Sequence, residues 1–316
     1  MQQHELKHAP PPAHAVLLVT AISGVCIHFL PSLEEIDQVA TIDVFTKPVF
    51  PDGVLSSPET MGWIRLFFCF IIYFTTIRFM FIGAEPTPMY LPGSKLKSRT
   101  IKIRGIRTQW WFTGWCWNIL GVYFFCSGLI SLLVSNGQEE LVKQNPWLLR
   151  VTFLVFEIAA PNAFLVSTIV RYALWENNLK KGGPSRTLSF QKFTSLMEHN
   201  GNIAMVLFEV CILGGTPVLP SHIAVAPLFG VLYVLFTWAV SNQWCPEKRP
   251  HLPYFLLDTT LGAKTTFMLA CLVVVLVVFY FFFSLIEIIL ERIDGGPISH
   301  AISMMILLSM VCRFRD

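Results

Sequence analysis

The chain has 316 residues, of which 54% are hydrophobic and only 14% are charged. Soluble domains carry about 25% charged residues, so this composition excludes an ordinary soluble protein, and a formal net charge of +3 gives no indication of nucleic acid as a partner. Apolar runs predict an all-α fold, a polytopic transmembrane helical bundle. The sequence contains no phosphate-binding glycine loop, no catalytic signature and no metal-ligand spacing among its eight cysteines, so we expect neither cofactor nor metal.

Apolar runs follow one another along the chain after a polar, proline-rich N-terminus, which we expect to be flexible over residues 1–13. The seven runs cover residues 14–30, 61–83, 110–134, 147–175, 196–219, 222–244 and 264–289. The first is short for a membrane span, and a cleaved signal peptide is the alternative. We prefer a retained span, which gives a six-span core plus an extra N-terminal span over 14–291. The C-terminal tail, 292–316, contains a short apolar helix that we expect to be interfacial or docked.

Positive charge alternates between the loops and sets the orientation. The loops 84–109, 176–198 and 245–264 contain six, four and three Lys or Arg residues, whereas the intervening loops contain one, one and none. Cytoplasmic loops carry the excess of Lys and Arg. We therefore expect these three loops to be cytoplasmic in an integral protein of an endomembrane or the plasma membrane, and an odd number of spans then places the C-terminal tail on the opposite side.

Polar residues interrupt the fifth apolar run, 196–219. His199, Asn202 and Glu209 recur at spacings of three and seven, which predicts one polar helical face turned toward the bundle interior. The orientation places His199 near the inner surface. Glu209 lies ~15 Å further along the helix, near mid-membrane and level with Glu157 of the fourth run. A structural hydrogen bond between helices is the simplest role for both glutamates, and a proton or ion path is the alternative.

Further polar residues fall at the level of His199. They are Thr113 and Asn118 in the third run and Arg171 at the end of the fourth. Asp258, in the segment before the last run, either caps the following helix or turns toward His199. Simpler roles compete with a shared site, because Arg171 suits interfacial anchoring and a threonine often bonds to the helix backbone.

Four motifs occur in order along the chain: FTGWCWNILGVYF, FEIAAPNAFLVS, HNGNIAMVLFE and PYFLLD. Over residues 105–290 the chain resembles the superfamily that joins the rolling stone proteins to the androgen-induced-gene family of membrane hydrolases. In the hydrolase branch a threonine and a histidine on different helices cleave fatty acid esters of hydroxy fatty acids. The resemblance implies Thr113 of FTGW, or Thr108 in another register, and His199 of HNGN. The extra N-terminal span departs from the six-span core of the hydrolases, and PYFLLD is closer to the rolling stone branch.

Three functions remain open from the sequence. In a hydrolase of fatty-acid esters of lipids, His199 would take the proton of Thr113, and Asp258 or Glu209 would orient the imidazole, with Asp258 favoured by depth. Asn118 or Asn202 would donate to the developing oxyanion. The second function is a non-enzymatic, rolling stone-type role in adhesion, fusion or scaffolding, and the third is a proton- or ion-coupled transporter. The expected partners are membrane lipids and, for the enzyme, a lipid-ester substrate.

Overall fold

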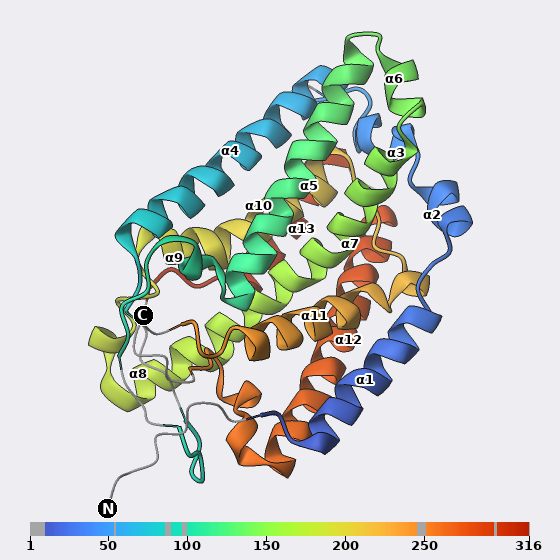
Figure 1. Cartoon of the computed structure of the whole chain (residues 1–316). Coiled ribbons are helices and arrows are strands. Elements are labelled where there is room, and N and C mark those ends of the chain that lie inside the picture. Colours follow the sequence, from blue (N-terminus) through green and yellow to red (C-terminus); the bar gives the residue numbers. More distant parts are fainter. Residues whose placement is uncertain are drawn as a thin grey trace, which may run out of the picture. The chain divides into compact units, whose positions relative to one another are not determined.

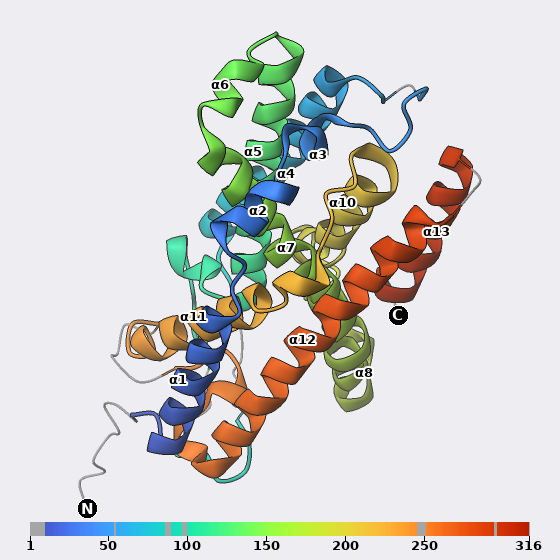
Figure 2. The same ribbon diagram turned by 90° about the vertical axis from the view of Figure 1, so that its right-hand side faces the viewer.

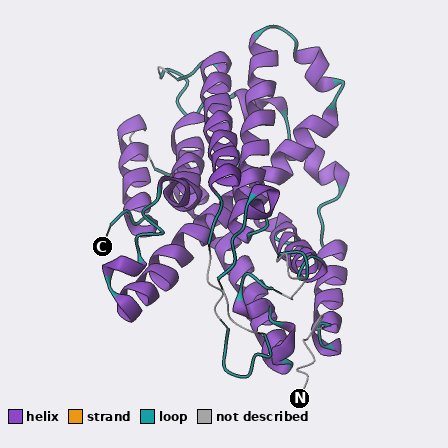
Figure 3. Cartoon of the chain, turned by 60° about the vertical axis from the view of Figure 1, so that its left-hand side comes forward, coloured by secondary structure: helices purple, strands orange, loops and turns teal. Residues whose placement is uncertain are grey.

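The computed structural model describes residues 10–53, 55–85, 90–96, 100–244, 251–293 and 296–315. These residues are predominantly helical (Figure 3), and their one pairing of extended backbone is an isolated antiparallel bridge between Ala84 and Ile103. Most of the expected flexible N-terminus, residues 1–9, and the basic residues at 97–99 and 248–249 lie outside the described ranges.

Six helical segments within the described ranges are long and apolar enough to cross a membrane (Figure 1). Helices satisfy their own backbone hydrogen bonds, which a spanning segment in hydrocarbon requires. The six are α4 (Pro58–Ile82), α5 (Phe112–Ser135), Pro146–Gly182 (α7, η2 and α8), Phe193–Leu213 (α9, η4, α10 and η5), Pro220–Ala239 (η6 and α11) and α12 (Ala263–Glu291). The prediction of an all-α, polytopic helical bundle is confirmed.

The expected extra N-terminal span corresponds to α1 (Ala13–His28). This helix has 16 residues, and α2 (Leu33–Val39) follows it at a bend of 61°, so the two count as a seventh span only when taken together. Ser32 begins α2 with a capping box, because its hydroxyl accepts the Glu35 N–H while the Glu35 carboxylate accepts the Ser32 N–H. The shorter helices are α3 (Ile42–Thr46) and α6 (Glu139–Lys143).

Two compact units divide the chain. The first comprises Met1–Leu30, Ile77–Phe112 and Ala224–Val278, and the second comprises Pro31–Thr76, Thr113–Ile223 and Phe279–Asp316. Both draw on segments that are distant in the sequence, so each unit is assembled from several spans.

In the first unit α1 packs along α11 (Val225–Ala239). Trp110 and Trp111 both meet Trp244 edge to face, with ring centroids 5.5 and 5.3 Å apart. Such edge-to-face pairs are favourable beyond the area they bury. The two tryptophans therefore lie in a packed aromatic cluster.

In the second unit α4 and α5 approach closely at Gly62 and Gly128. A Cβ atom built on either glycine would lie 3.1 Å from the carbonyl oxygen of the other. Small residues at such crossings let the backbones of membrane helices approach each other, which increases the packing between them. This close approach positions Arg65 of α4 and Ser131 of α5 for the polar cluster described below.

The last helix, α13 (Gly296–Val311), docks along α10 within the second unit (Figure 2). His300 Nδ1 lies 3.2 Å from the Cys211 carbonyl oxygen, and Asn200 Nδ2 donates to the Arg313 carbonyl at 2.7 Å, so the two helices run antiparallel. The tail helix is thus docked on the second unit, and Arg313 pairs with Glu176 near the end of the span Pro146–Gly182. The side of the membrane on which the tail lies stays a prediction.

Candidate functional site

Thr113 and His199, the predicted catalytic pair, both belong to the second unit. Thr113 is half-buried in the first turn of α5, and His199 lies in η4 (Met197–Gly201), a π-helical stretch. No hydrogen bond joins the two side chains, both of which are described, and the buried Nδ1 atom of His199 has no hydrogen-bond partner among the described residues. Their joint action in catalysis therefore stays a prediction.

Polar residues of the fifth span face different neighbours. Ser167 of α7 (Pro146–Ile169) donates to the His199 carbonyl and lies 3.1 Å from Asn202 Oδ1. Glu209 instead contacts α4 and α5. Short π-helical stretches at 197–201 and 209–213 lie on either side of α10 (Asn202–Phe208), and Asn202 and Glu209 are both buried.

The other predicted supporting residues form hydrogen bonds with groups other than Thr113 and His199. Asn118 donates through Nδ2 to the Gly114 carbonyl at 2.6 Å, one turn back in its own helix. Arg171 donates to main-chain carbonyls near the end of α13. Asp258 lies in the first unit, where its carboxylate accepts hydrogen bonds from Ser94 and from the Thr260 N–H. Asp258 thus caps the short turn Thr259–Leu261, which resembles the simpler of its two predicted roles.

A buried ion pair surrounds Glu209. Arg65 and Glu209 are both 0% exposed, and Arg65 Nε lies 3.1 Å from each Glu209 carboxylate oxygen. The other side of the guanidinium donates to Ser131 Oγ at 2.8 Å and to the Phe45 carbonyl. Because nearly every donor of the guanidinium is used, the charge of Glu209 is matched inside the bundle.

Tyr123 links this ion pair to the chain that follows η5 (Glu209–Leu213). Its hydroxyl donates to Glu209 Oε1 at 2.8 Å and lies 2.8 Å from Thr216 Oγ1. Since the tyrosine proton is directed at the carboxylate, Thr216 is the donor in the second bond. The polar network therefore continues from the ion pair into the segment 214–222.

A second buried carboxylate, Glu157 of α7, holds the other part of that segment. Glu157 Oε1 accepts the Leu219 N–H at 3.0 Å and the Tyr280 hydroxyl at 3.2 Å, and Oε2 lies 2.8 Å from His222 Nδ1. Glu157 lies eleven residues beyond Pro146, the start of α7, which is ~17 Å along the helix. The segment 214–222 therefore lies beside the interior of α7 and not at its end.

A third carboxylate, Glu287 of α12, meets the same segment. Its Oε2 accepts the Val218 N–H at 2.6 Å, whereas Oε1 is buried and has no partner among the described residues. Glu287 itself is only 8% exposed. A buried carboxylate with a single backbone donor and no basic partner is costly to keep charged.

The sequence of the 214–222 segment explains why the helix stops there. Gly214 and Gly215 follow the last helical turn, Gly215 has a φ of +61°, and Pro217 and Pro220 lack the N–H that a helix needs. Two N–H groups of this broken stretch find side-chain acceptors instead, because Glu287 accepts the Val218 N–H and Glu157 accepts the Leu219 N–H. The Gly214–Pro217 run therefore ends the helix, whose last residue is Leu213.

We define the carboxylate cluster as the polar side chains around the 214–222 segment. Its members are Arg65, Tyr123, Glu157, Glu209, Thr216, His222, Tyr280 and Glu287. Three carboxylates there face one guanidinium and one imidazole. Such an arrangement can store and pass protons within the bundle. Within the described part of the chain, no group of three or more His, Cys, Asp or Glu side chains is placed to hold a metal ion.

The sequence points to Glu157 and Glu209 but not to the residues around them. Arg65 in GWIRLFF and Glu287 in SLIEIIL carry a signal, because each is a charge inside an apolar run. Tyr123, Thr216 and Tyr280 carry none, since hydroxyl residues are common in membrane helices and their partners lie far away along the chain.

Comparison with known proteins finds no relative of the chain. No protein-family model matches the chain, and neither the curated proteins nor the solved structures contain a match to it.

Proposed function

We propose that the protein is a proton-coupled membrane transporter whose proton site is the carboxylate cluster. The observation that carries the proposal is the broken segment 214–222, which lies beside the interior of α7 and is held there by buried carboxylates. Irregular backbone at membrane depth occurs where protein buries it or where it lines a path. Transporters place their ion sites at such interrupted helices.

Glu287 is the proposed exchanging group. Its buried charge is uncompensated, and its free Oε1 atom gives a proton a place to bind. Arg65 matches the charge of Glu209, so that pair holds the frame of the site. Glu157 and His222 form a hydrogen-bonded pair on the other part of the same segment. Protonation of Glu287 would weaken its hold on the Val218 N–H and so change the position of the segment.

Replacing Glu287 with glutamine will reduce proton flux to that of protein-free liposomes, because a glutamine side chain cannot take up and release a proton. The amide oxygen can still accept the Val218 N–H, so the fold will be retained. The measurement is the rate of internal pH change in liposomes that contain the purified protein and a pH-sensitive dye, with the membrane potential clamped.

Glu291→Gln is the matched control, since Glu291 is the exposed last residue of the same helix. This variant will keep the wild-type flux. Wild-type flux in Glu287→Gln, or no flux in the wild type, would contradict the proposal.

A lipid-ester hydrolase is a second candidate, supported by the resemblance noted in the sequence and by a separate observation. The buried His199 Nδ1 and Glu198 Oε1 atoms have no hydrogen-bond partner among the described residues. An imidazole nitrogen without a partner is free to accept a proton from a substrate, a water molecule or the Thr113 hydroxyl.

Thr113→Ala and His199→Ala will each lower the hydrolysis of a fatty acid ester of a hydroxy fatty acid by about 10²–10⁴-fold if these side chains are nucleophile and base. Release of free fatty acid by purified protein is the measurement, and Ser94→Ala, in the first unit, is the control. Equal hydrolysis in all three variants would exclude the enzyme. A protein with neither hydrolysis nor proton flux would fit a non-enzymatic, rolling stone-type role.

A further inference from the structure

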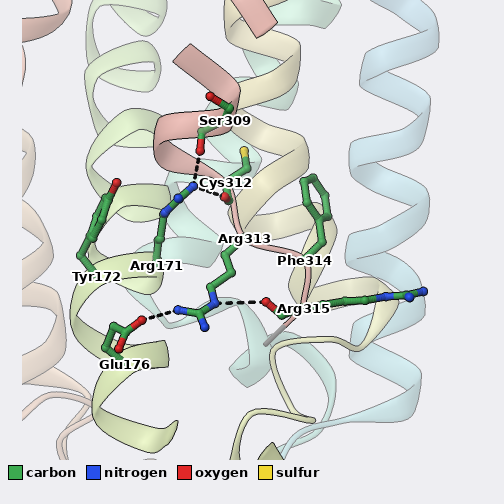
Figure 4. A pocket seen from close by; sticks show the side chains of 8 residues that line it. All are labelled: Arg171, Tyr172, Glu176, Ser309, Cys312, Arg313, Phe314 and Arg315. Carbon is green, nitrogen blue, oxygen red and sulfur yellow. Dashed lines mark hydrogen bonds and ion pairs between the residues drawn. The ribbon is translucent and has the colours of Figure 1, made fainter. Parts of the chain in front are cut away.

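A cavity of about 550 Å³ lies where the end of the chain meets the long helix Pro146–Gly182 (Figure 4). Arg171, Tyr172 and Glu176 line it from that helix, and Cys312 and Arg313 line it from the tail. Its volume falls in the range of sites for small ligands. The carboxylate cluster contributes none of the residues that line it.

Basic groups dominate this cavity. Figure 4 shows Arg171 and Arg313 on the same side as Tyr172 and Glu176, while the side chain of Arg315 extends away from them. The cavity has three guanidiniums and one carboxylate. Glu176 forms an ion pair with Arg313, and Arg171, which donates to main-chain carbonyls of the tail, has no acidic partner among the described residues. A guanidinium presents several donors in a plane, which suits a phosphate group.

An apolar groove of about 460 Å³ continues from the cavity along α13. It is lined by Ile298, Ala301, Ile302, Met305 and Ile306. Ser309 lines both the groove and the basic cavity, so the two are adjacent. From Ile298 to Ser309 the groove follows α13 for ~16 Å, which is enough for a medium-length acyl chain.

We propose that this cavity and the adjacent groove together bind an anionic glycerophospholipid, with the phosphate at Arg171 and Arg313 and one acyl chain along α13. Charge complementarity selects the headgroup, and the apolar groove selects an amphiphile over a soluble anion. The site lies toward the Gly182 end of the span Pro146–Gly182, because Arg171, Tyr172 and Glu176 belong to that end. This inference goes beyond the proposed function, since a bound lipid would also fix the tail against the Arg171 region.

Native mass spectrometry of the purified full-length protein tests the proposal, with dioctanoyl phosphatidic acid as the probe. Arg313→Gln will weaken its binding about fivefold, the effect expected for one basic residue near a phosphate. Glu176→Gln will strengthen binding by a similar factor, because it removes the competing carboxylate. A purely structural role for the ion pair predicts the opposite sign for Glu176→Gln. Ala301→Phe, which fills the groove, will weaken lipid binding without changing the charge.

Matched controls separate a built site from general attraction to a basic surface. The double variant Lys180→Gln and Lys181→Gln removes two exposed charges from the Gly182 end of the same span and will leave binding unchanged. Equal weakening in this variant and in Arg313→Gln would overturn the proposal, as would equal binding of dioctanoyl phosphatidylcholine. If inorganic phosphate competes as strongly as the lipid and Ala301→Phe has no effect, the ligand is a free phosphate and the lipid assignment fails.

Discussion

Replacing Arg65 with methionine will lower the free energy of unfolding in detergent micelles by about 3–5 kcal/mol. The change leaves Glu209 buried at 0% exposure with Tyr123 as its remaining side-chain donor, and an unpaired charge in that position has lost its compensation. Ser131 and the Phe45 carbonyl lose a donor as well. Unfolding of the purified protein by denaturant, followed by circular dichroism, measures the loss.

Two comparisons make this result specific to the buried pair. The double variant Arg65→Met and Glu209→Met will recover much of the stability, because replacing both charges with apolar groups removes the penalty of the unpaired one. Arg150→Met, which breaks the exposed pair with Asp37, will leave the unfolding midpoint nearly unchanged. A double variant that is as unstable as the sum of its single changes would show that the two charges do not act as a pair.

Gly214→Ala will destabilise the protein by about 3 kcal/mol, although it adds only one methyl group. A Cβ atom at this position would overlap Nη2 of Arg65 and lie 3.0 Å from Met61 Cε. The guanidinium cannot move aside without giving up Glu209. The same unfolding measurement applies, and the cost of Gly214→Ala will shrink in an Arg65→Ala background, where the overlapping atom is gone.

The neighbouring glycine is the control for this variant. At Gly215 a Cβ atom would meet nothing closer than 3.7 Å, and the positive φ of +61° is the source of strain there. Gly215→Ala will therefore cost about 1–2 kcal/mol, with no dependence on Arg65. If Gly214→Ala lowers the free energy of unfolding equally in both backgrounds, the absence of a side chain at this position is not what makes room for the Arg65 guanidinium.

The sequence predicts the helical spans well because hydrocarbon leaves the backbone few alternatives. The run at 264–289 lies within α12, and the run at 61–83 matches α4 except for Gly83. The predicted fifth run extends to Leu219, whereas the helical span ends at Leu213. Val218 and Leu219 raise the hydropathy count there, although Gly214, Gly215 and Pro217 interrupt the helix. Hydropathy does not register where a backbone N–H finds its acceptor, and Glu157 and Glu287 supply those acceptors from elsewhere in the chain.

The docking of the tail is not visible in the sequence either. Arg313 lies 137 residues from its partner Glu176, and Arg171 lies 141 residues from the Cys312 carbonyl that it binds. The candidate site was only half visible for a similar reason, because the partners of Glu157 and Glu209 are 62 to 144 residues away in the sequence.

The docking of α13 on the span Phe193–Leu213 sets an order for the assembly of the protein during its synthesis. The contacts that join the tail to this span connect residues 89 to 113 positions apart, from Cys211 to His300 and from Asn200 to Arg313. The face of the span that α13 covers is therefore made long before α13 itself, because α11 and α12 are translated in between. Closure of the second unit waits for the final stretch of the chain, so a ribosome that stalls before α13 releases a bundle with an open side.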